Sequence, residues 1–551
     1  MASLSQQPKP ADDELERHLA LVGRSNSSPQ GVLQDTKKRQ LYSLTTAPLI
    51  SRKVKQHVAT SLARKGDQDL PFDMYGLLGL RTATYDKDRD IASQNPISPL
   101  DYPSGQIQTP MQDDPIADNL LYSNTSAPWS AFICGQQGAG KSYTMSCLLE
   151  NALLQGHALG RNDNPLTGLV FHYDKHAAYE STQICEAAFL CTKGVKVEVL
   201  VSPTNFAAMK KEYHNSERFG VSKKELPKVR PLLFDDAMLS VDYMLNLMNQ
   251  GDSDKLPLYM ATVVDVVREM KMLGQTFTVA SFKTRMTQRG MKPDQKAMFD
   301  QRMALLETFM WSSAKAVIRS LANGERGLKS TPGQLTIVDL SCSTIGEADV
   351  CTFYEMCLSM FLANREKTSS LLVGIDEAHK FLTETPEAKH LTEELVRLIR
   401  QLRHLKSRVL IATQEPTLAP ELMDLCDVSI IHRFRSPAWF SAIKDHLAGL
   451  VWSGSVGGSG NGKEVFERIE DSDGSNPFYS ASEEGDGGAD LDDEDDTLAE
   501  SMAELGLDDE QRLQKQVNAL SKVQPLNTKY IKVQIRQRLT TDGGKSQMAS
   551  R

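Results

Sequence analysis

The sequence predicts an α/β protein built on a mostly parallel β-sheet, and two observations predict it. From about residue 128, short apolar runs alternate with helical patterns, as strands buried on both faces alternate with crossover helices. In addition, a glycine-rich loop follows one of these runs and opens a helix. Seven runs are expected to be strands: Ser130–Cys134, Gly168–Tyr173, Val195–Val201, Leu335–Leu340, Leu371–Ile375, Val409–Ala412 and Val428–Ile431.

Composition excludes several classes of protein. The chain has 551 residues, 40% of them hydrophobic, and a net charge of −9. Residues 464–510 alone carry 19 acidic residues against one arginine, which leaves a balance of +9 for the rest. No apolar run is long enough to span a bilayer, and the polar N-terminus has no secretory signal, so a cytoplasmic or nuclear protein without a membrane segment is expected. None of the eight cysteines forms a C-x-x-C pair, which argues against a zinc ribbon and for reduced thiols.

Changes in composition and apolar periodicity along the chain suggest four regions. Residues 1–118 are expected to be mostly disordered, and residues 119–452 to form the α/β domain. A helical insertion at about 237–329 interrupts that domain, with helices expected at Met238–Met248, Leu258–Leu273 and Lys292–Met310. Residues 453–526 contain Gly/Ser runs and the acidic block, and are expected to be a disordered insert. Residues 527–551 hold an alternating strand that should return to an edge of the sheet, followed by a tail.

The strongest motif is a phosphate-binding loop. Residues 135–142 read Gly-Gln-Gln-Gly-Ala-Gly-Lys-Ser and match G-x-x-x-x-G-K-[ST] between an apolar run and a helix over 143–153. Glycines let backbone N–H groups curl around phosphates, Lys141 reaches the β- and γ-phosphates, and Ser142 is a ligand for Mg²⁺. An ordinary glycine-rich turn is the alternative, which this context disfavours. The predicted nucleotide-binding residues are Gly135, Gln136, Gln137, Gly138, Ala139, Gly140, Lys141, Ser142 and Tyr143.

A second motif supplies carboxylates. The apolar run Leu371–Ile375 ends in Asp376 and Glu377. Asp376 is predicted to hold Mg²⁺ and Glu377 to polarise the attacking water, whereas a solvated strand end is the alternative. The letters Asp-Glu-Ala-His over 376–379 suggest a DEAH-box helicase, but the 235-residue separation of Lys141 from Asp376 and the absence of a Q-R-x-G-R-x-G-R stretch argue against that family.

Together these motifs resemble the HerA–FtsK superfamily of P-loop motor ATPases, HerA most closely. The resemblance covers roughly residues 120–450 and the last strand. It implies a P-loop NTPase core, a hexameric ring and ATP-driven translocation on DNA or its unwinding. Gln414 would be the sensor of the γ-phosphate, with a strand-end amide bonded to the backbone as the alternative. The motifs are Gly135–Ser142, Phe171–Asp174, Thr336–Ser341, Gly374–Phe381 and Ile411–Pro416.

An arginine finger is expected from a neighbouring subunit, because charge develops on the transferred phosphoryl group. A leucine stripe over 391–405 leaves Arg400 and Arg403 pointing away from the core, and Arg403 is preferred by the resemblance. A solvated basic face is the alternative, and Arg433 and Arg435 are lesser candidates. Asp174 and Asp339 end strands at the same edge, where structural and catalytic roles are equally open.

The sequence predicts the identity of the nucleotide and of the binding partners less directly than it predicts the phosphate loop. No N-K-x-D guanine motif occurs, so ATP with Mg²⁺ is favoured. DNA binding has support only from the +9 balance and a loose basic stretch, for which a solvated surface is the alternative. The acidic block could mimic nucleic acid on such a surface. An ATPase or ATP-gated switch acting on protein partners, and a nucleotide-holding scaffold, are the other hypotheses. The basic stretch consists of Lys210, Lys211, Lys223, Lys224, Lys228 and Arg230.

Overall fold

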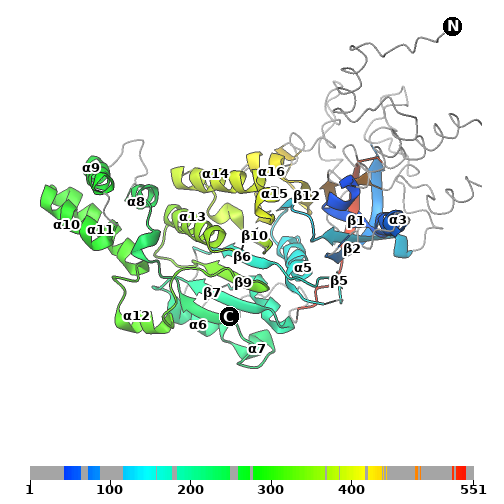
Figure 1. The fold of residues 1–551 in the computed structure, drawn as a ribbon, viewed down its shortest axis with the longest axis horizontal. Coiled ribbons are helices and arrows are strands. Elements are labelled where there is room, and N and C mark those ends of the chain that lie inside the picture. The colour runs from blue at the N-terminus through cyan, green and yellow to red at the C-terminus, as the bar shows by residue number, and fades with distance from the viewer. Residues whose placement is uncertain are drawn as a thin grey trace, which may run out of the picture.

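The computed structural model describes most of the chain between residues 42 and 443 and the strand near the C-terminus (Figure 1). The expectations for residues 1–41, for most of the acidic insert and for 541–551 lie outside the described residues. Those described are 42–63, 72, 74–86, 116–156, 158–175, 183–248, 259–273, 277–366, 369–383, 385–415, 420–436, 438–439, 442–443, 478–481, 484–485, 524–525 and 529–540.

A parallel sheet of eight strands forms the centre of the described part of the chain, which confirms the predicted fold class. Its order is β12-β4-β11-β10-β6-β9-β7-β8. All seven expected strands are present, with ends shifted by at most two residues. Their bounds are β4 (Ser130–Cys134), β6 (Thr167–His172), β7 (Lys196–Val201), β8 (Lys228–Pro231), β9 (Gln334–Asp339), β10 (Leu371–Ile375), β11 (Ser407–Thr413) and β12 (Val428–Ile431).

The edge strand β8 was not expected. Its sequence, Lys-Val-Arg-Pro, carries two cations and a proline, which are typical of an edge strand. Because β8 contains no apolar run, the sequence pattern does not predict it.

Helices cover both faces of the sheet, because successive strand residues point to opposite sides. Phe132 belongs to one apolar cluster and its neighbours Ala131 and Ile133 to the other. In Figure 1 the helices α13 and α14 lie on one side of the strands, and α5 and α6 on the other. The bounds are α5 (Lys141–Leu153), η3 (Glu186–Lys193), α6 (Phe206–Tyr213), α13 (Glu347–Ala363) and α14 (Pro386–Arg400).

The helical insertion lies between β8 and β9 and projects from one end of the sheet (Figure 1). The three expected helices are present as α8, α9 and α11, and α10 and α12 are two more that the apolar pattern did not predict. Tyr243 anchors the insertion on α13 through a 2.7 Å hydroxyl contact with Ser359, and Arg302 pairs with Asp349. The bounds are α8 (Val241–Met248), α9 (Tyr259–Met272), α10 (Val279–Arg289), α11 (Pro293–Phe309) and α12 (Ala316–Leu321).

An antiparallel extension continues the sheet beyond β12, in the order β13-β16-β2-β3-β1. It differs from expectation in two ways. Part of the segment expected to be mostly disordered forms β1, α3 and β2, and the terminal strand β16 is inside the sheet instead of at its edge. The bounds are β1 (Leu49–Ser51), α3 (Arg52–Ala63), β2 (Tyr75–Asp86), β3 (Leu120–Asn124), β13 (Phe478–Ala481) and β16 (Lys529–Ile535).

Two glycines explain why the apolar pattern of the sequence did not predict strand β2. Gly76 and Gly79 interrupt its apolar residues, and glycine lowers strand propensity. A Cβ at Gly79 would lie 2.2 Å from the carbonyl oxygen of Gln534, so β16 can approach only a glycine there. No helix within the described part of the chain is long and apolar enough to cross a membrane.

Candidate functional site

The candidate site lies where the carboxyl ends of four neighbouring parallel strands meet. β4 leads into the phosphate loop (residues 135–142), β11 ends beside Gln414, β10 ends at Asp376 and Glu377, and β12 leads into His432. Because β11 lies between β4 and β10, Gln414 is placed between the phosphate loop and the carboxylate pair. Two motifs 235 residues apart in sequence therefore share one edge of the sheet.

Glycine is required at both ends of the phosphate loop. Gly140 has φ of 100° and is the N-cap of α5, a conformation that side chains with a Cβ rarely adopt. At Gly135, a Cβ would lie 2.6 Å from the Cβ of His432. The loop is thus closely backed by β12, and the N-terminus of α5 adds positive potential where phosphate would bind.

Lys141 is the buried cation of the site. The residue is 4% exposed, and its ammonium donates a hydrogen bond to the carbonyl oxygen of Gln136 at 3.3 Å. Burial lowers the pKa of Lys141, and the carboxylates of Glu377 and Asp376 oppose that shift. The charge of Lys141 therefore interacts with those of the acidic pair at this edge of the sheet.

Ser142 and Asp376 fit a Mg²⁺ ion. The Ser142 hydroxyl lies 3.5 Å from Asp376 Oδ1, so two hard oxygen donors converge. Burial raises the pKa of Asp376, and the neighbouring Glu377 adds to that rise, so a divalent cation would offset both effects. If bound, Mg²⁺ would be held by these two residues and would neutralise charge on the phosphate oxygens.

Glu377 is held in a constrained position. Its φ of 53° lies in the left-handed region, which costs free energy for a residue other than glycine. Gln414 Nε2 donates to Glu377 Oε2 at 2.8 Å, and His379 Nδ1 lies 3.4 Å from the same oxygen. The carboxylate thus has two polar neighbours that fix its direction.

His379 was missed as a site residue by sequence reasoning. Burial lowers its pKa, so the imidazole is neutral near pH 7. The signal was available in the sequence, because His379 follows Glu377 by two residues at a strand end.

His432 was also missed. It is buried behind the phosphate loop, where its Nε2 lies 3.1 Å from the hydroxyl of Thr144 and its backbone N–H donates to Cys134 at 2.8 Å. Burial, together with the charge of Lys141, lowers the pKa of His432 to about 3. The His432 imidazole is therefore neutral, and its hydrogen bond with Thr144 connects the end of β12 to α5.

The predicted arginines separate into two places. The carbonyl oxygen of Arg433 accepts from the N–H of Gln136 at 3.1 Å, which places Arg433 beside the phosphate loop of its own chain. Arg403 is exposed in α15 (Leu402–Leu405), immediately before β11 begins. It therefore lies at the amino-terminal edge of the sheet, opposite the phosphate loop. Within one chain Arg403 does not join the site, and its role as a finger stays a prediction that requires a neighbouring subunit.

The two strand-end aspartates differ in their surroundings. Asp339 is fully buried and accepts from the Tyr213 hydroxyl at 2.6 Å and from the Ser341 N–H at 3.1 Å. Its bonds point to a structural role. Asp174, by contrast, lies 3.7 Å from the Lys380 ammonium, at the border of the site.

The basic stretch is less available than the sequence suggested. Arg230 is 0% exposed and donates to Glu198 at 2.9 Å, and Lys228 pairs with Glu325 at 2.9 Å. At least two of the six cations are therefore engaged in ion pairs, which weakens this stretch as a DNA-binding surface.

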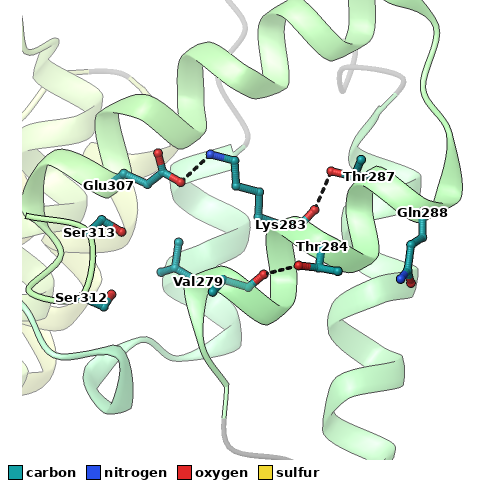
Figure 2. A pocket seen from close by; sticks show the side chains of 9 residues that line it. Val279, Lys283, Thr284, Thr287, Gln288, Glu307, Ser312 and Ser313 are labelled. Carbon is teal, nitrogen blue, oxygen red and sulfur yellow. Dashed lines mark hydrogen bonds and ion pairs between the residues drawn. The ribbon is translucent and has the colours of Figure 1, made fainter.

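A separate cavity of about 500 Å³ lies in the helical insertion, between α10 and α11. Figure 2 shows the ion pair between Lys283 and Glu307 that crosses it, at 2.6 Å. No predicted site residue lines this cavity, and the insertion lies far from α5 in Figure 1. It is not part of the candidate site.

Several solved structures resemble this chain. VirB4 of Thermoanaerobacter pseudethanolicus is 13% identical, with 58% of this chain and 80% of that chain covered and a TM-score of 0.37. The plasmid coupling protein TrwB in complex with ADP and Mg²⁺ is 11% identical, with 58% and 74% covered and a TM-score of 0.33. The genome packaging NTPase B204 from Sulfolobus turreted icosahedral virus 2, in complex with AMP, is 9% identical, with 64% and 92% covered and a TM-score of 0.23.

No protein-family model matches the chain, and no curated protein does. The function of this chain therefore has to be argued from its own residues.

Proposed function

We propose that this protein binds and hydrolyses ATP as a P-loop motor. The observation that carries the proposal is the convergence of the phosphate loop with the acidic pair, with Ser142 Oγ 3.5 Å from Asp376 Oδ1. Lysine, hydroxyl and carboxylate side chains at one sheet edge, behind a loop of backbone N–H groups, are the set that a Mg²⁺-nucleotide requires.

Each side chain has a part in the proposed reaction. Lys141 binds the β- and γ-phosphates, and Ser142 and Asp376 hold Mg²⁺. Glu377 orients and polarises the attacking water as the general base. Gln414 contacts Glu377 directly. A γ-phosphate that forms a hydrogen bond with the Gln414 amide would therefore also affect Glu377, the proposed general base.

We extend the proposal to a ring-forming DNA translocase or helicase. The exposed position of Arg403, at the edge opposite the phosphate loop, supports a site completed by a neighbouring subunit. The DNA track rests on the motif resemblance and on the +9 balance outside the acidic block. An ATPase or ATP-gated switch that acts on protein partners is the outcome to be distinguished.

The test is turnover measured with and without DNA. The wild-type chain should hydrolyse ATP with Mg²⁺, and Glu377→Gln should bind ATP yet lose turnover by about 10²- to 10⁴-fold, the contribution of a positioned general base. Full turnover in Glu377→Gln would refute the role of Glu377. A rate that rises with DNA, together with an ATP-dependent increase in molecular mass, supports the translocase, and an unchanged rate favours protein partners.

A further inference from the structure

The segment that follows β16 contacts one face of the phosphate-loop helix α5. We call residues 536–540 the C-terminal strap. Arg536 donates to three helix groups at one side: Glu150 Oε2 at 2.7 Å, Asn151 Oδ1 at 3.0 Å and the Cys147 carbonyl at 3.1 Å. These positions lie on one face of α5, because residues three and four apart are neighbours on a helix.

The strap is tightly bonded to that face. The Glu150 carboxylate, 0% exposed, also accepts from the backbone N–H groups of Leu539 and Thr540 at 3.0 Å each. With Arg536 only 6% exposed, this is a buried, fully bonded ion pair, and removing either partner would be costly. The strap is therefore a fixed part of the fold next to the phosphate loop.

Tyr143 is the residue through which the strap reaches the proposed nucleotide site. Its hydroxyl donates to the Arg536 carbonyl oxygen at 3.0 Å and accepts from the Arg538 N–H at 3.0 Å. The Arg538 guanidinium lies 5.9 Å from the centre of the Tyr143 ring and pairs with Glu186 at 3.2 Å. The half-buried Tyr143 is thus held at its hydroxyl by two hydrogen bonds, and the Arg538 guanidinium lies near its ring.

The direction of the phosphate chain places the nucleoside near this ring. Asp376, at the end of β10, lies where Mg²⁺ and the γ-phosphate belong, so the α-phosphate belongs on the other side of the first turn of α5, away from β10 and toward β12 and β16 in the strand order. Tyr143 is the first residue after the phosphate loop and stands at that point. An aromatic face there can stack on a base, because every base has a π-face.

We propose that the Tyr143 ring is the platform for the nucleoside of the bound nucleotide, and that the C-terminal strap is the element that positions it. This inference rests on the proposed nucleotide site. Tyr143 is the contact residue, and Arg538 is a positioning residue that acts through the ring. The C-terminal strap thereby determines how the base, as opposed to the phosphates, is held.

The test compares two ligands, Mg²⁺-ATP and Mg²⁺-tripolyphosphate, by calorimetry on the full chain. Tripolyphosphate has the same phosphate groups but no nucleoside. Tyr143→Leu should weaken ATP binding about tenfold, the loss of one stacking contact, and leave tripolyphosphate binding within about twofold. Tyr143→Phe retains the ring and should keep most of the ATP affinity. Arg538→Gln should lower the ATP-to-tripolyphosphate affinity ratio less than Tyr143→Leu does.

The outcomes separate the two proposals. An unchanged ATP-to-tripolyphosphate affinity ratio in Tyr143→Leu, whether neither affinity falls or both fall equally, would overturn the platform. Wild-type chain that binds neither ligand would overturn the proposed nucleotide site itself. Arg289→Gln, on the helical insertion, is the matched control for the arginine change and should leave both affinities as they are.

Discussion

The carboxamide nitrogen of Gln414 lies 2.8 Å from Glu377 Oε2 and joins the ends of two adjacent strands, β11 and β10. The bond fixes a carboxylate whose backbone already has φ of 53°. The proposed general base and the proposed phosphate sensor are therefore one bonded unit, and a change in either should be felt by the other.

Replacing Gln414 should slow hydrolysis without preventing binding. Gln414→Leu removes the hydrogen bond to Glu377, so turnover should fall about ten- to a hundredfold while ATP affinity changes by less than about threefold. Single-turnover hydrolysis and equilibrium binding measure the two effects. Gln401→Leu, an exposed glutamine between α14 and α15, is the control. Unaltered single-turnover rates in Gln414→Leu would contradict the coupling.

Removing the buried cation should abolish nucleotide binding. Lys141→Ala deletes the ammonium that would contact the β- and γ-phosphates, and removes a positive charge that interacts with Asp376 and Glu377. ATP affinity should fall at least a hundredfold, on the scale of a lost charged contact in a buried site. Lys196→Ala, at the exposed start of β7, should bind as the wild type does. Retained affinity in Lys141→Ala would place the phosphates elsewhere.

Mixing two inactive variants should restore activity if Arg403 acts across subunits. Arg403→Ala lacks the finger but keeps Glu377, and Glu377→Gln keeps the finger but lacks the base. In a mixed assembly, some sites combine Glu377 of one chain with Arg403 of the next, so the ATPase rate should recover partly. Arg397→Ala, 58% exposed on α14, is the control and should be active alone. No recovery on mixing would exclude Arg403 as a finger in trans.

His432 should make the protein less stable in mild acid. Its pKa is about 3 in the folded chain and 6.5 as an unperturbed group, so between these values the unfolded chain binds an extra proton. The free energy of unfolding should therefore fall with falling pH by up to about 1.4 kcal/mol per pH unit in this window. His432→Gln should flatten that part of the curve, as measured by urea unfolding at several pH values. An equal slope in both proteins would show that His432 is not the cause.

Breaking the buried ion pair at the sheet edge should destabilise the fold. Arg230→Met leaves Glu198, 5% exposed, without its main partner, and should lower the free energy of unfolding by about 3–5 kcal/mol. The double variant Arg230→Met with Glu198→Leu removes both charges and should recover much of the loss. Denaturant unfolding measures both. A double variant no more stable than Arg230→Met alone would show that the uncompensated charge is not the reason.

Local pattern was enough to predict most of the parallel core. Strands such as β10 and β4 are continuous apolar runs, and burial on both faces forces that composition whatever the neighbours are. The phosphate loop was equally visible, because its glycines are required by the backbone itself, as φ at Gly140 shows. These features depend on residues close together in sequence, so the sequence by itself determined the fold class and the two halves of the site.

Tertiary structure alone decided the contacts that join distant segments. Nothing local in β16 indicates that it pairs with β2, some 450 residues earlier, or that Arg536 then reaches Glu150. His432 behind Gly135 and Arg230 against Glu198 are further cases, and both would be taken for surface residues from their neighbours in sequence. Their physical reason is the same: the free energy of burying a polar group is set by the partner that meets it, and that partner is brought there only when the whole sheet assembles.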